Sequence, residues 1–114
     1  MIENGCMAVG EGANHPCTLD AIQAFRDAGV FFAPGNAANA GGVATSSLEM
    51  SQNSQGMSWD GDKVNKKMEE IMVNIHDNTA RAAAMYGCQG DYYFGANVAA
   101  FLKIADAMKG QGIC

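Results

Sequence analysis

Two short polar segments carry the residues best suited to bind a ligand. Asn14 closes the segment GEGAN, and Asn39 lies within NAANAGG, which extends from residue 36 to residue 42. An asparagine amide both donates and accepts hydrogen bonds, so it can pair with a carboxamide or with ribose hydroxyl groups. Asn14 would lie just beyond the carboxyl end of a strand, where open α/β sheets bind ligands. On spacing alone, the plainer interpretation is that both asparagines cap turns.

A run of hydroxyl side chains follows Gly41 and Gly42, and it comprises Thr45, Ser46 and Ser47. Glycines let a ligand approach the backbone closely. The hydroxyl groups would lie in the first turn of a helix, whose free N–H groups and dipole favour a carboxylate. The alternative is that these hydroxyl groups only face solvent.

Other local patterns predict neither a metal site nor a phosphate loop. The two histidines, His15 and His76, are far apart in the sequence, and no Cys/His cluster has metal-ligand spacing. Gly10-Glu11-Gly12 begins like a dinucleotide fingerprint, but His15 occupies the position of the third glycine and Pro16 displaces the helix start. We therefore reject this segment as a pyrophosphate loop.

The elements that must position these residues begin with a strand, a helix and a second strand. Short apolar runs at residues 6–10 and 30–33 predict two buried strands. Residues 19–28 predict the helix between them, with Thr18 as its N-cap and Gly29 as its stop. This unit fits a parallel pair joined by a crossover helix.

The remaining sequence predicts a small-residue loop at 36–42 and then helices. One helix spans residues 43–55, a second is capped by Asp60, and a third spans residues 96–108. The second carries an apolar stripe of Val64, Met68, Ile71, Met72, Ile75, Thr79, Ala82 and Tyr86, and the third presents Val98, Phe101, Leu102, Ala105 and Met108 on one face. Two strands cannot form an independently stable sheet. The chain is therefore predicted to be the C-terminal end of a larger doubly wound α/β domain.

Composition and charge narrow the classes of function. The chain has 114 residues, of which 48% are hydrophobic and 17% charged, as expected of one globular domain. Its net charge of −5 argues against nucleic-acid binding. No run approaches the roughly 20 apolar residues of a membrane helix. The N-terminal residues do not show the charged and apolar pattern of a secretory signal peptide. Four cysteines without a C-x-x-C pair indicate reduced thiols and a cytoplasmic protein.

Longer segments are similar to one enzyme family. Four of them resemble consecutive segments of hexameric bacterial-type glutamate dehydrogenases, in the family's order: AVGEGANHPCT, FFAPGNAANAGGVATSSLEMSQNS, SWDGDKVNKKMEEIMVNIHDN and GANVAAFLKIADAMKGQG. NAGGVATS followed by LEM is the segment most specific to the glutamate branch. The related leucine, phenylalanine and valine dehydrogenases typically carry an apolar residue at the position of Ser46, so they are the less favoured alternative.

The resemblance implies roles for four residues. Asn14 and Asn39 match asparagines at the nicotinamide end of the cofactor, which is NADP or NAD. Ser46 matches the serine that binds the substrate's side-chain carboxylate, and Val43 matches the valine that packs on its aliphatic part. The implied reaction is the reversible oxidative deamination of L-glutamate to 2-oxoglutarate and ammonia, with the hydride chemistry supplied by the cofactor.

The resemblance also implies a Rossmann-like fold and a missing part. Residues 1–57 would be the terminal βαβ-helix part of the dinucleotide-binding domain, and residues 58–114 would pack back on the substrate domain of a homohexameric enzyme. The family's catalytic lysine and aspartate and its glycine-rich pyrophosphate loop have no counterpart, so we expect a C-terminal fragment without catalytic residues. The alternative is a non-catalytic helical interaction module.

Three positions depart from the family's pattern. His15 stands where the family usually has methionine, Cys17 where it has threonine, and Asn36 where lysine is common. None of the four matched residues is affected, although Asn36 changes the charge of its loop.

Overall fold

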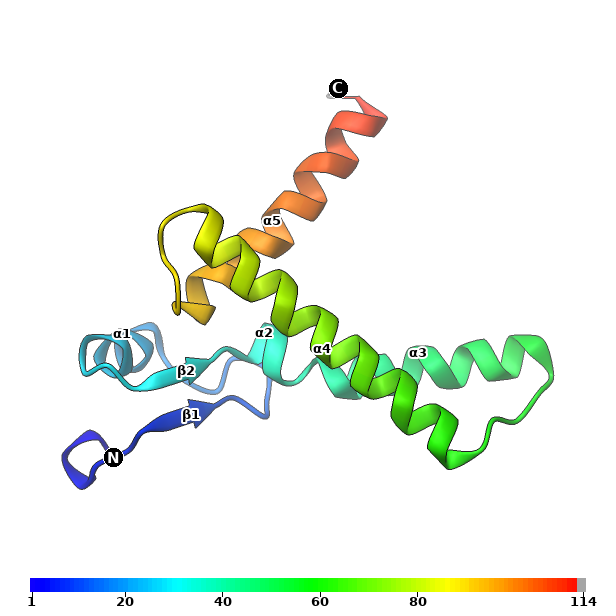
Figure 1. Cartoon of the computed structure of the whole chain (residues 1–114), viewed down its shortest axis with the longest axis horizontal. Helices are drawn as coiled ribbons and strands as arrows, with labels where there is room; N and C mark the ends of the chain where they lie inside the picture. Colours follow the sequence, from blue (N-terminus) through cyan, green and yellow to red (C-terminus); the bar gives the residue numbers. More distant parts are fainter. Residues whose placement is uncertain (113–114) are drawn as a thin grey trace.

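The computed structural model describes residues 1–112 of the chain. A short 3-10 helix, η1 (Ile2–Asn4), precedes a strand–helix–strand unit, and four further helices follow (Figure 1). The unit comprises β1 (Ala8–Gly10), α1 (Leu19–Asp27) and β2 (Phe31–Ala33). The later helices are α2 (Gly35–Ala38), α3 (Ala40–Gln55), α4 (Gly61–Met85) and α5 (Tyr92–Gln111).

The predicted strand–helix–strand unit is confirmed. β1 and β2 pair in parallel, with Val9 opposite Phe32. The Thr18 hydroxyl accepts a hydrogen bond from the Ala21 N–H at 3.3 Å and so caps α1. Gly29 has a φ of 69°, the left-handed conformation in which helices commonly end. β2 starts one residue later than predicted because the Val30 N–H donates to Phe25 at the end of α1 rather than to β1.

The core lies where β2 meets α1 and the start of α5. Ile22 and Phe32 are each 4% exposed. The Phe32 ring stacks on Phe25, with 6.2 Å between ring centroids, and meets the edge of Tyr93 at 6.3 Å. Residues from α1 and α5 therefore pack on the same side chain of β2.

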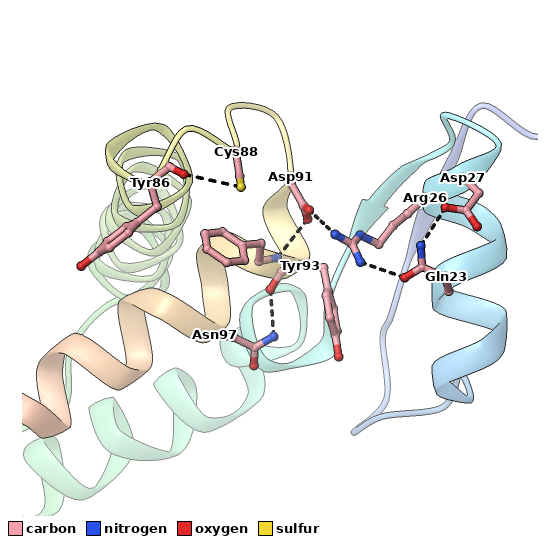
Figure 2. A network of polar contacts seen from close by, with 9 residues as sticks. Gln23, Arg26, Asp27, Tyr86, Cys88, Asp91, Tyr93 and Asn97 are labelled. Atoms are coloured by element: carbon pink, nitrogen blue, oxygen red, sulfur yellow. Dashed lines mark hydrogen bonds and ion pairs between the residues drawn. The ribbon is translucent and has the colours of Figure 1, made fainter.

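An ion pair also joins α1 to the start of α5 (Figure 2). The Arg26 guanidinium donates to the carboxylate of Asp91 and to Gln23, and it lies over the Tyr93 ring, 5.4 Å from its centroid. The other oxygen of Asp91 accepts the Phe94 N–H at 2.9 Å. Asp91 thus caps α5 and anchors it to α1 at once.

Helices α4 and α5 cross closely near the start of α5 and then diverge (Figure 1). Ala82, Ala83 and Ala96 are buried at the crossing. A Cβ atom at Gly95 would lie 2.3 Å from the carbonyl oxygen of Thr79, a distance that real Cβ atoms essentially never show. The crossing therefore requires glycine at this position.

Three predictions about the helical region were wrong. Residues 36–42 are largely helical rather than a loop, because the Ala37 and Ala38 N–H groups donate to Pro34 and alanine favours the helix. Helix α5 begins at Tyr92 rather than at residue 96, since Asp91 supplies its cap. Phe101 and Met108, on the predicted apolar face of α5, are 66% and 51% exposed, because α5 has by then left α4 (Figure 1), and the shared face itself stays a prediction. Tyr86, 54% exposed, follows the end of α4 and does not extend its buried stripe.

Candidate functional site

The segments that follow the two strands lie at one edge of the sheet. The parallel register places Gly10 beside Ala33, and the Glu11 N–H donates to the Ala33 carbonyl at 3.0 Å. Asn14 lies in the loop after β1, and Asn39 lies between α2 and α3, which follow β2. The structure thus places the two asparagines predicted to bind cofactor beyond the carboxyl ends of neighbouring strands.

A buried carboxylate joins these two segments. Glu11 is 2% exposed, and its Oε2 accepts the Gly35 N–H at 2.6 Å while its Oε1 accepts the Cys17 N–H at 3.1 Å. Burial acts to raise the pKa of Glu11, but hydrogen bonds from Gly35 and Cys17 outweigh it and hold the pKa below its ordinary value. For the Cys17 thiol, burial and the neighbouring Glu11 carboxylate raise the pKa. Glu11 is therefore an ionised residue inside the fold.

The loop that carries Asn14 also rests directly on Gly35. A Cβ atom at Gly35 would lie 2.8 Å from the Ala13 carbonyl oxygen and 3.3 Å from the His15 nitrogen. His15 has a φ of 52°, which is uncommon for a residue with a side chain. The chain around Asn14 is therefore tightly shaped against the start of α2.

The side chain of Asn39 does not cap α3. Asn39 is the C-cap residue of α2 and the N-cap residue of α3, yet its side chain makes no capping hydrogen bond at the start of α3. The side chain of Asn14 is exposed. A capping role at the start of α3 therefore does not account for the side chain of Asn39.

Helix α3 has a packed face and an open face. Ala44 is buried, and the Thr45 hydroxyl lies 3.3 Å from the sulfur of Met68 on α4. Val43 is 74% exposed and Ser46 is exposed, and residues three apart are neighbours on a helix surface. The structure thus brings these two predicted substrate-binding residues together on the open face.

One prediction about this helix was wrong. Because α3 begins at Ala40 rather than at Val43, Ser46 lies in its second turn, where backbone N–H groups bond within the helix. The Ser46 hydroxyl donates to the Gly42 carbonyl at 3.4 Å, a long hydrogen bond. A carboxylate at this position would therefore contact the hydroxyl group and not the free N–H groups of the helix start.

Sequence reasoning missed Glu11 as a functional candidate. In the sequence, Glu11 stood out only as the residue between Gly10 and Gly12, in the segment rejected as a pyrophosphate loop. The available signal was an acidic residue directly after an apolar strand, at the edge where ligands bind.

The described residues contain neither a metal-ligand cluster nor a helix that could span a membrane. Within residues 1–112, no three His, Cys, Asp or Glu side chains gather as ligands for a metal ion. None of the helices in this range combines the length and the apolar character needed to cross a bilayer.

The sequence matches relatives along nearly its whole length. Glutamate dehydrogenase of Bacteroides thetaiotaomicron is 50% identical over 117 residues, covering 99% of this chain and 26% of the relative. NADP-specific glutamate dehydrogenase of Escherichia coli K12 is 50% identical over 116 residues, covering 99% of this chain and 25% of the relative. The chain thus spans about a quarter of the length of these relatives.

The fold is similar to solved structures of glutamate dehydrogenases. The crystal structure of Plasmodium falciparum glutamate dehydrogenase superposes with a TM-score of 0.92 at 46% identity, covering 99% of this chain and 24% of that one. The predicted fold class is confirmed, since two parallel strands followed by long helices match the corresponding part of that structure. The sequence profile of the Glutamate/Leucine/Phenylalanine/Valine dehydrogenase family matches residues 1–112. The chain therefore belongs to the Glutamate/Leucine/Phenylalanine/Valine dehydrogenase family.

Proposed function

We propose that this chain is the part of an NAD(P)-dependent glutamate dehydrogenase that binds the nicotinamide end of the cofactor and the side chain of the substrate. The reaction of the whole protein is the reversible oxidative deamination of L-glutamate to 2-oxoglutarate and ammonia. The observation that carries this proposal is the pairing of Val43 and Ser46 on the open face of α3. Relatives named glutamate dehydrogenase, at 50% identity, support the same substrate.

Each of the four residues has a role that suits its chemistry. Asn14 and Asn39 hold the carboxamide and ribose groups of NADP or NAD through amides that both donate and accept. Ser46 donates a hydrogen bond to the side-chain carboxylate, and Val43 packs on the methylene groups of the substrate. The fit to a nicotinamide cofactor rests on the Asn39 amide, which the cap at the start of α3 does not use. The cofactor, when bound, supplies the hydride chemistry.

The catalytic acid and base belong to the rest of the whole protein, and we propose no catalytic residue within this chain. Residues 1–57 form the terminal part of the dinucleotide-binding domain, and residues 58–114 pack back on the substrate domain. The whole protein is a cytoplasmic homohexamer, in keeping with the family resemblance and with the free thiols of Cys6, Cys17 and Cys88.

A chimeric enzyme provides the test. Residues 1–112 of this chain replace the matching segment of the Escherichia coli NADP-specific relative, and activity is assayed with L-glutamate and with L-norvaline. A hydrogen bond to a charged group contributes about 1.5–3 kcal/mol. Ser46→Val should therefore lower kcat/KM for glutamate by about 10- to 150-fold while leaving norvaline nearly unaffected.

Ser47→Val is the matched control, because Ser47 is also exposed on α3 and its hydroxyl donates to a carbonyl four residues earlier. An inactive parent chimera that folds would contradict the glutamate dehydrogenase proposal and favour a non-catalytic interaction module. A parent chimera that prefers norvaline would favour a dehydrogenase for aliphatic amino acids. Equal losses in the Ser46 and Ser47 variants would remove Ser46 from the site.

A further inference from the structure

We infer that Glu11 is a positioning residue for the nicotinamide end of the cofactor, acting through the segments that carry Asn14 and Asn39. This inference rests on the proposed function, and it assigns to the buried carboxylate a task beyond holding the fold together.

The two oxygens of Glu11 bind two different segments. Oε1 accepts the Cys17 N–H at 3.1 Å, so Glu11 and Cys17 bracket the loop that contains Asn14. Oε2 accepts the N–H of Gly35 at 2.6 Å, at the first residue of α2. Helix α2 ends at Ala38, directly before Asn39. Glu11 therefore fixes the loop that contains Asn14 relative to α2, the helix that directly precedes Asn39.

Steric contact at the same junction fixes the separation. With the Ala13 carbonyl oxygen only 2.8 Å from where a Gly35 Cβ atom would lie, the loop has no room to move closer to α2. The hydrogen bonds of Glu11 prevent the loop from moving away. Because Ala13 directly precedes Asn14, a shift of this contact displaces the asparagine itself.

The junction needs a carboxylate rather than a neutral acceptor. Both partners are N–H donors, and glutamine offers one oxygen to them while its amide group would face the second donor. Water cannot replace the lost bond easily, since Glu11 is only 2% exposed. Glu11→Gln thus keeps the volume of the side chain and loosens one of the two segments.

The test is a double-mutant cycle on NADPH affinity in the chimera, measured by the fluorescence of the bound cofactor. We expect Glu11→Gln to weaken NADPH binding by about 10- to 100-fold, by analogy with the loss seen when the hydrogen-bond partner that orients a metal ligand is removed. In an Asn39→Ala background, or in an Asn14→Ala background, the same substitution should weaken binding much less. Such coupling distinguishes positioning from a general loss of stability, which would act equally in every background.

Control variants keep the test decisive. Glu70→Gln removes an exposed carboxylate on α4 and should leave NADPH affinity unchanged. If Glu11→Gln does not fold, Glu11→Asp, whose carboxylate is one methylene shorter and so cannot hold both segments at their present separation, takes its place in the cycle. Wild-type NADPH affinity in the folded Glu11 variant, or equal losses in all backgrounds, would overturn the inference.

The inference and the proposed function fail in different ways. If Asn14→Ala and Asn39→Ala both leave NADPH affinity unchanged, the assignment of the asparagines is wrong. If these two variants weaken binding and the Glu11 variant does not, only the positioning role is wrong.

Discussion

Replacing Gly95 by alanine should force α4 and α5 apart at their crossing. The new Cβ atom would lie 2.3 Å from the Thr79 carbonyl oxygen and 3.0 Å from the Cβ atom of Ala83. Ordinary van der Waals contact begins at 3.4 Å, so the distance to the Thr79 oxygen is about 1 Å too short. The carbonyl oxygen belongs to the backbone of α4 and cannot rotate away. Overpacking typically costs about 1–3 kcal/mol, and the backbone contact places this variant at the upper end, about 3 kcal/mol.

Gly110→Ala on the same helix is the matched control. A Cβ atom there would meet nothing within 4 Å among residues 1–112, so the higher helix propensity of alanine should leave the protein as stable or more stable by up to about 1 kcal/mol. Both variants are compared with the parent chimera by thermal unfolding at one scan rate. A Gly95→Ala midpoint equal to or above that of Gly110→Ala would refute the close crossing.

Three further outcomes follow from the polar contacts. In urea unfolding, Asp91→Ala should lower the stability of the protein more than Arg26→Ala, because Asp91 also caps α5. The coupling energy between the two substitutions in a double-mutant cycle should stay within about 1 kcal/mol, because both side chains of the ion pair are partly exposed. Folding lowers the pKa of Glu11, so the unfolded state binds more protons in acid. The stabilisation from ionised Glu11 is therefore complete above the ordinary pKa of 4.5 and is lost as pH falls through the lower pKa of the folded state. Unfolding measured between pH 3 and 6 should show this loss of stability in the parent and a weaker pH dependence in Glu11→Gln. Asp60→Ala should cost about 0.5–2 kcal/mol by loss of the 2.7 Å bond to the Lys63 N–H, and Asp62→Ala, which removes no such bond, should cost less.

The sequence predicted best the features that depend on neighbouring residues. Thr18 and Asp60 each cap the helix that follows them, as their side-chain type and position indicate. Gly29 ends α1 in a left-handed conformation, as expected of a glycine directly after an apolar helical repeat. The strand pairing followed as well, since a helix between two short apolar runs leaves a parallel arrangement as the natural solution.

The helix starts that the sequence did not predict combine local capping bonds with distant contacts. Helix α2 was predicted as a loop, and the acceptor for its first N–H is Glu11, 24 residues earlier in the chain. The start of α5 is held by Asp91 against Arg26, a partner 65 residues away. Neither contact leaves a periodic pattern, so an apolar repeat could not locate these helix starts.

The candidate site divides in the same way. The spacing of Val43 and Ser46 indicates a shared helix face, but only the burial of Ala44 and the contact of the Thr45 hydroxyl with Met68 on α4 show which face is packed. The roles of the four residues came from family resemblance rather than from their chemistry alone. Glu11 required the structure, because its importance lies in what its two oxygens bind.

The isolated 114-residue polypeptide should neither oxidise glutamate nor form a well-packed monomer. Its radius of gyration of 16.8 Å exceeds the roughly 13 Å of a compact domain of this length. Large apolar side chains on α3 and α5 are exposed, among them Met50, Phe101 and Ile104. Such surfaces favour association. We therefore expect the purified polypeptide to bind a hydrophobic dye, to scatter light as an associated species, and to leave NADP and NAD unreduced in the presence of glutamate; sustained turnover, or a dye-free monomer with a cooperative melt, would contradict this reasoning.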